Sequence, residues 1–207
     1  AWNTIDAEKY MRTFSETSTD RKKTLTLISS RGCPFDCTFC NVFQSWGKTF
    51  RKRSAENILA EIDYLVEQFG VEEICFVDDN MTIDKKRTLE ICEGLKSRDV
   101  TWRVVNVASF VTNENMLEQM KASGCTKVSI SVESGSPQVL KDMKKPVDLE
   151  WSENVVKVCR RVGLPVTVAF ITGMPYETKE DMMKTFEWAA RVRPDWCTFS
   201  VLVPYPG

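Results

Sequence analysis

The sequence predicts an α/β fold of parallel strands with outer helices, and two observations support this prediction. Six strand-like runs alternate with helical patterns in units of about 30 residues, the length of a strand–helix–strand unit. Such units join parallel strands by right-handed crossovers. Polar, Gly and Pro residues also follow the strands at one common edge, where open doubly wound sheets and barrels alike carry their sites.

Length and composition indicate one globular domain. The chain has 207 residues, of which 43% are hydrophobic and 28% charged, so it can bury a sizeable core. Lys and Arg number 28 against 29 Asp and Glu, a net charge of -1. Because no global excess of positive charge exists to hold a polyanion, nucleic acid is not expected as a partner.

The distribution of apolar and charged residues predicts where the protein is located and where its core domain begins. No apolar run approaches the roughly 20 residues needed to span a bilayer, and the N-terminus lacks the charged-then-apolar order of a signal peptide. A cytoplasmic location without membrane contact is therefore expected. Residues 1–23 are polar and aperiodic, which predicts a linker or domain edge, whereas 24–207 is expected to be the core domain of a longer protein.

The first unit runs from a strand over residues 24–28 through Arg31-Gly32 into a cysteine-rich loop. Ser54 then has the character of a helix N-cap, and apolar residues at helical spacing follow it as far as Gly70. A second strand over 73–77 leads into Asp78-Asp79-Asn80, after which Asp84 caps a helix that extends to about Lys96.

The remaining units repeat this order. Strands are predicted over 102–107, 128–132, 166–171 and 197–203. Helices are predicted over 113–122, closed by Gly124, over 152–162, and from Thr178, where Asp181 gives capping-box spacing, to about Val192. Ser136-Pro137 opens a further short helix.

Three of the eight cysteines carry the strongest chemical signal. Cys33, Cys37 and Cys40 lie within eight residues, whereas the other five are isolated among apolar neighbours, as buried thiols usually are: Cys75, Cys92, Cys125, Cys159 and Cys197. Clustered thiols without a secretory signal bind metal more often than they form disulfides. The chain has no histidine, which excludes Ser-His and Cys-His nucleophile pairs and every His-ligated metal.

The three thiolates suit an iron–sulfur cluster or zinc, but no fourth ligand stands beside them. One interpretation is an open coordination position at which a metal binds substrate. The alternative is a structural zinc site in a binding module, completed by a distant cysteine such as Cys75 or Cys125.

The motif Cys33-x-x-x-Cys37-x-x-Cys40, with Phe39 before the last cysteine and a strand–helix series after it, resembles the radical S-adenosylmethionine (SAM) superfamily. The resemblance covers about residue 24 to the end and implies a partial TIM-type (βα)6 barrel. It implies that Cys33, Cys37 and Cys40 hold a 4Fe-4S cluster whose fourth iron binds SAM. Reductive cleavage of SAM then gives a 5'-deoxyadenosyl radical that abstracts hydrogen from a substrate.

The resemblance also implies contacts to SAM. Phe39 would pack near the adenine, and Asp78-Asp79-Asn80 stands where the superfamily often has Gly-Gly-Glu to hold the SAM amino group. Glu133 would meet the ribose or methionine portion. Ile171-Thr172-Gly173 resembles the motif that lies against the adenine. Of the other residues near the loop, Arg51-Lys52-Arg53 could bind an anion or form a solvated surface, and Trp46 is a candidate for the substrate side.

The combined motifs look most like radical SAM enzymes that follow a cobalamin-binding domain, a subgroup that includes methyltransferases. This implies cobalamin held by a domain outside the chain, an organic substrate, and a reductant protein such as flavodoxin or ferredoxin. A methylthiotransferase-type radical SAM enzyme is the alternative activity on the same core. Such enzymes usually bring additional cluster and basic RNA-binding domains, which the charge balance does not favour.

Overall fold

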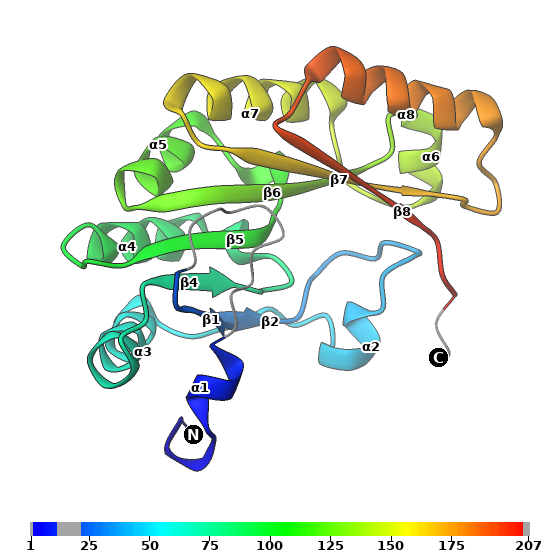
Figure 1. Cartoon of the computed structure of the whole chain (residues 1–207). Helices are drawn as coiled ribbons and strands as arrows, with labels where there is room; N and C mark the ends of the chain where they lie inside the picture. Colours follow the sequence, from blue (N-terminus) through cyan, green and yellow to red (C-terminus); the bar gives the residue numbers. More distant parts are fainter. Residues whose placement is uncertain (1, 12–21, 205–207) are drawn as a thin grey trace.

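A six-stranded parallel sheet forms the centre of the protein, and the computed structural model describes residues 2–11 and 22–204 of it (Figure 1). Its strands follow one another in chain order, β1-β4-β5-β6-β7-β8, and each neighbouring pair is parallel. Their bounds are Thr24–Leu27 (β1), Glu73–Phe76 (β4), Thr101–Val107 (β5), Cys125–Glu133 (β6), Val166–Thr172 (β7) and Trp196–Val201 (β8).

The crossover helices lie along the outside of this curved sheet (Figure 1). They are Ala55–Phe69 (α3), Lys85–Leu95 (α4), Glu114–Ala122 (α5), Leu149–Val162 (α7) and Lys179–Val192 (α8), with the short α6 at Pro137–Asp142. The predicted partial TIM-type (βα)6 barrel of parallel strands with outer helices is confirmed. Because all six strands run in the same direction, their carboxyl ends meet at one edge.

Capping side chains begin the helices where the sequence predicts them. Ser54, Asp84 and Asn113 accept hydrogen bonds from the backbone three residues on, at 3.2, 3.0 and 3.0 Å. Thr178 and Asp181 form the expected reciprocal capping box before α8. Helix α7 begins at Leu149, three residues earlier than predicted, because the Asp148 carboxylate accepts from the Trp151 amide at 2.8 Å and caps the helix there.

Several strand bounds differ from the prediction, and those of β6 and β8 differ most. β6 begins at Cys125 and not at Val128, because its first residues pair with β5. β8 spans Trp196–Val201, whereas 197–203 was expected, because its register with β7 runs from Thr167 to Thr172 and ends there. β1 ends one residue early, at Leu27.

The two faces of the sheet differ in chemistry. Large side chains on the convex face pack against the helices, and Phe76, Trp102 and Phe170 are among the most completely buried. The concave face carries polar side chains from the alternate positions, among them Glu73, Arg103, Ser129, Ser131 and Thr167. The fold therefore directs polar groups from several strands toward the interior of the barrel.

The remaining elements are short. An antiparallel hairpin pairs Ser30–Arg31 (β2) with Arg51–Lys52 (β3), and α2 spans Val42–Trp46 between them. Near the N-terminus, a 3-10 turn (Trp2–Thr4) precedes α1 (Ala7–Tyr10); two more such turns lie at Met81–Ile83 and Ser109–Val111. Of the expected linker over residues 1–23, residue 1 and residues 12–21 lie outside the described residues. None of the described helices could cross a membrane.

Candidate functional site

The cysteine loop leaves β2 at the carboxyl edge of the sheet and forms one wall of a cavity of about 350 Å³. Cys33, Cys37 and Cys40 all line it. The opposite walls come from the ends of β4, β5 and β6 and from the segment after α6, and include Asp78, Asp79, Asn80, Asn106, Ser131, Glu133 and Lys145. Three thiols therefore share one space with the polar residues of three strand ends.

Backbone contacts hold the loop against the segment after α6. The Thr38 amide donates to the Met143 carbonyl at 2.9 Å, and the Cys37 thiol lies 3.8 Å from the Lys144 carbonyl. Within the loop, the Cys40 amide donates to the Cys37 carbonyl at 3.1 Å. These bonds hold the loop that carries the three thiols against the segment after α6.

Asp78 ties the start of the loop to the end of β4. Its side chain is 2% exposed, and its carboxylate accepts from the Ser29 amide at 3.1 Å, from the Ser29 hydroxyl at 2.7 Å and from the Ser30 hydroxyl. Asp79 accepts from the Gly32 amide at 3.0 Å. Both expected SAM contacts line the cavity, and both carboxylates also position the backbone that leads to Cys33.

A chain of amide and hydroxyl groups continues across the sheet edge. Asn80 is buried, and its side-chain oxygen accepts from the Thr82 hydroxyl at 3.3 Å. Asn106 donates to the Asp79 carbonyl and accepts from the Ser131 hydroxyl at 3.2 Å. The sequence reasoning missed Asn106 and Ser131. Both occupy the concave-face alternation of β5 and β6, which was the available signal.

Glu133 ends β6 in a left-handed conformation (φ 71°), which a non-glycine residue rarely adopts. Its carboxylate pairs with the Lys145 ammonium at 2.9 Å, and both side chains are largely buried. Lys145 Nζ also lies 5.8 Å from the centroid of the Phe39 ring. Lys145 was missed because it follows a short helix, away from any strand end.

The residues expected against adenine lie beside this cavity. Phe39 lines it, and both Phe39 and Ile171 pack against a small cluster of Val139, Met143 and Met174. The Thr172 carbonyl accepts from the Leu202 amide, and the Gly173 amide donates to Glu177 at 2.6 Å. Ile171 thus shares a hydrophobic cluster with Phe39, but Ile171, Thr172 and Gly173 do not line the cavity, and neither do Trp46 and Arg51-Lys52-Arg53.

Burial is the main influence on the pKa values of Cys33 and Cys37. Burial raises the pKa of Cys33 above its ordinary value of 9.0, and a backbone hydrogen bond at Phe35 opposes it. Burial likewise raises the pKa of Cys37, with the Lys145 charge as the main opposing effect. Both thiols are therefore protonated at neutral pH in the metal-free chain, so metal binding has to displace their protons.

The donor set fits an iron–sulfur cluster with one open position. Thiolates are the usual ligands of such clusters, and the three here face one cavity. Neither cysteine considered for a zinc site lines it, because Cys75 faces a different cavity with Arg103 and Cys125 is buried at the start of β6. Among the described residues no three Cys, Asp or Glu side chains gather closely enough to hold a single metal ion.

The fold and the site together define a (βα)6 barrel protein in which three thiols of one loop line a cavity at the carboxyl edge of the strands. The chain belongs to the radical SAM superfamily, whose family model matches residues 27–189. The predicted superfamily is thereby confirmed.

Curated relatives include two methyltransferases. The chain is 35% identical over 184 residues to an uncharacterized methyltransferase of Pyrococcus horikoshii, covering 87% of this chain and 40% of the relative. It is 30% identical to the cytidylyl-2-hydroxyethylphosphonate methyltransferase of Streptomyces wedmorensis, covering 100% of this chain and 41% of the relative. The chain thus spans less than half the length of these relatives.

A solved structure has the same fold. The radical SAM methyltransferase TsrM from Kitasatospora setae, determined with cobalamin and a 4Fe-4S cluster, superposes with a TM-score of 0.78 at 17% identity, covering 95% of this chain and 39% of that one. At this identity the likeness concerns the fold.

Proposed function

We propose that this chain is the catalytic core of a radical SAM enzyme, with Cys33, Cys37 and Cys40 as ligands of a 4Fe-4S cluster. One observation carries the proposal: the three thiols of a single loop line the same cavity as the polar ends of β4, β5 and β6. Three ligands leave one iron open, and the cavity gives a small molecule access to it.

The bound cluster would supply the electron that cleaves SAM to methionine and a 5'-deoxyadenosyl radical. The chain's own residues then bind and orient SAM. The largely buried Lys145 can pair with the SAM carboxylate, and Glu133 can accept from a ribose hydroxyl or the amino group. Asp79 and Asn80 offer acceptors to the ammonium group from the end of β4. Phe39, supported by Ile171, offers an apolar face to the adenine.

Asp78, Thr172 and Gly173 have supporting roles in this arrangement. Asp78 fixes Ser29 and Ser30 at the entrance to the cysteine loop. Thr172 and Gly173 shape the turn after β7, where the left-handed conformation of Gly173 (φ 86°) lets the chain turn beside Ile171. These residues would affect SAM binding by placing the groups that touch it.

The whole protein would be a cobalamin-dependent methyltransferase that acts on an organic substrate. Two curated relatives are methyltransferases, and TsrM binds cobalamin. Because the chain spans about 40% of its relatives' length, cobalamin would be held by a domain outside it. A reductant protein such as flavodoxin or ferredoxin would supply the electron.

Anaerobic reconstitution tests the core activity. We expect the full-length protein to hold about four irons and four sulfides per chain and to form 5'-deoxyadenosine from SAM with a chemical reductant. The Cys33→Ala/Cys37→Ala/Cys40→Ala variant should lose both properties. Cys197→Ala is the matched control, because Cys197 is exposed on β8 and should leave both unchanged. Equal iron content and no SAM cleavage in either wild type or triple variant would refute the proposal.

Methyl transfer needs a separate measurement. We expect the full-length protein purified with cobalamin to show the visible spectrum of a bound corrin, and methyl-labelled SAM to lose its label to cobalamin. A protein that cleaves SAM but binds no cobalamin would retain the radical SAM assignment and exclude the cobalamin-dependent one.

A further inference from the structure

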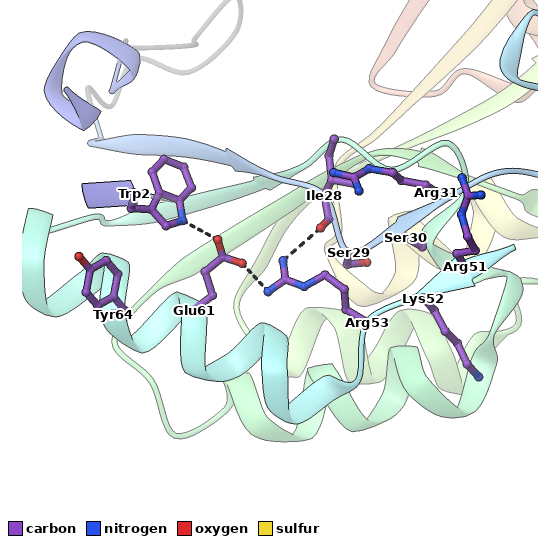
Figure 2. A pocket seen from close by; sticks show the side chains of 10 residues that line it. All are labelled: Trp2, Ile28, Ser29, Ser30, Arg31, Arg51, Lys52, Arg53, Glu61 and Tyr64. Carbon is purple, nitrogen blue, oxygen red and sulfur yellow. Dashed lines mark hydrogen bonds and ion pairs between the residues drawn. The ribbon is translucent and has the colours of Figure 1, made fainter. Parts of the chain in front are cut away.

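The β2–β3 hairpin places a group of cations directly beside the cysteine loop. Arg31 ends β2 two residues before Cys33, and Arg51 and Lys52 form the paired strand β3. Together with Trp46 from α2 they form what we call the hairpin patch. It adjoins an open cleft of about 680 Å³ that is also lined by Ser29, Ser30 and Arg53 (Figure 2).

Two of these cations have no carboxylate partner among the described residues. The Arg31 guanidinium lies 5.1 Å from the centroid of the Trp46 ring, and Arg51 donates to the Trp46 carbonyl at 2.8 Å. Lys52 pairs with Asp84, whereas Arg53 turns inward to pair with Glu61 at 2.5 Å (Figure 2). The patch is therefore positive in a chain whose net charge is -1.

Trp46, the aromatic residue of the patch, is also exposed. Helix α2 buries none of its side chains, and Trp46 remains 41% exposed although it lies only six residues after Cys40. Surfaces that combine exposed aromatic residues with arginine are typical of protein–protein interfaces. The chemistry of the patch thus fits a protein with an acidic surface.

Different residues form the hairpin patch and the cavity that contains the three thiols. None of Arg31, Trp46, Arg51 and Lys52 lines the cavity that contains the three thiols. A protein could therefore contact the hairpin while SAM and substrate occupy the cavity. Arg31 places the patch close along the chain to the first thiol, which suits short-range electron transfer.

We propose that the hairpin patch docks an acidic protein reductant, a reduced flavodoxin or ferredoxin, beside the cluster. This inference rests on the proposed function. In the step that it serves, one electron leaves the reduced flavin or iron–sulfur centre of the partner and enters the 4Fe-4S cluster. The partner is oxidised by one electron, the cluster is reduced by one, and no covalent bond changes.

Rapid-mixing measurements of cluster reduction in the reconstituted full-length protein test this proposal. With reduced flavodoxin at low ionic strength, we expect Arg51→Glu to lower the second-order rate constant about tenfold, because oppositely charged surfaces steer association. The wild-type rate constant should fall as salt is added, and that of the variant should depend less on salt.

Two controls separate docking from damage to the site. Reduced methyl viologen, a small cation, should reduce the cluster of Arg51→Glu at a rate within twofold of the wild-type rate. The rate of SAM cleavage should likewise stay within twofold. Lys121→Glu makes the same charge change at an exposed residue of α5 and should leave the rate constant with flavodoxin unchanged. Equal rate constants with flavodoxin for wild type and Arg51→Glu would overturn the proposal. It would also be overturned if Arg51→Glu weakened only the binding of a 20-nucleotide RNA and left cluster reduction by flavodoxin unchanged. Failure of wild type with methyl viologen would instead contradict the proposed function.

Discussion

The Lys145 ammonium pairs with the Glu133 carboxylate at 2.9 Å, and this bond spans the cavity wall between the end of β6 and the segment after α6. Both partners are largely buried, and Glu133 keeps an unfavourable backbone conformation. Such a pair is costly to break, because removing one partner leaves the other charge buried and unpaired.

Replacing Lys145 by methionine should therefore destabilise the metal-free protein. We expect Lys145→Met to lower the free energy of unfolding by about 3 kcal/mol, measured by urea denaturation, because the Glu133 carboxylate then has no counter-charge. The double variant Glu133→Gln/Lys145→Met should recover most of this loss. If the double variant were as unstable as the sum of the single variants, the two residues would not be coupled.

Substituting Asp78 should weaken the anchoring of the cysteine loop. Asp78→Asn places an amide among three donors from Ser29 and Ser30, so we expect a loss of about 2 kcal/mol in unfolding free energy and lower iron content after reconstitution. Asp79→Asn neutralises the acceptor of a single hydrogen bond, which the Gly32 amide donates, and should lower the unfolding free energy by less. Equal effects of the two substitutions would show that the Asp78 network does not anchor the loop.

The sequence predicts the barrel well because local signals agree with the tertiary structure. Caps at Ser54, Asp84, Asn113 and Thr178 begin helices where periodicity indicates them. The predicted bounds of strands are wrong where residues distant in the sequence determine them. β6 gains three residues by pairing with β5, and that partnership cannot be read from either segment alone.

The site was only partly predictable for the same reason. The thiol motif is local and identifies the loop, and strand ends indicate Asp79 and Glu133. Lys145 lies 12 residues from Glu133 on an irregular segment, and nothing in its immediate sequence distinguishes it from the neighbouring lysines. The use of Asp78 as an anchor likewise depends on Ser29, which lies 49 residues away.

Buried cysteines outside the site should make stability fall at alkaline pH. Burial raises the pKa of Cys92 to about 11, above its ordinary value of 9.0. Below pH 9.0 the thiol is neutral in both folded and unfolded chains, so its contribution is constant. Between pH 9.0 and about 11 the unfolded chain loses this proton and the folded chain keeps it, so stability falls as the pH rises.

A comparison with Cys92→Ala isolates this effect. The free energy of unfolding of wild type minus that of the variant should be constant below pH 9.0 and shrink by about 1.4 kcal/mol per pH unit above it. Urea denaturation of the metal-free proteins at several pH values measures this difference. A difference that stays constant up to pH 11 would contradict the burial effect.

The approach to the cysteine loop requires glycine at position 32. Gly32 has φ 86°, and a Cβ there would lie 2.4 Å from the Thr49 carbonyl oxygen, so Gly32→Ala combines backbone strain with a backbone clash. Gly47 has a similar φ of 78° with nothing near its Cβ position, so Gly47→Ala carries the strain alone. We expect Gly47→Ala to cost about 1 kcal/mol in unfolding free energy. Gly32→Ala should cost more than twice as much and also reduce iron incorporation, because Cys33 follows directly. Similar losses of stability and iron in the two variants would show that the contact with Thr49 does not constrain the loop.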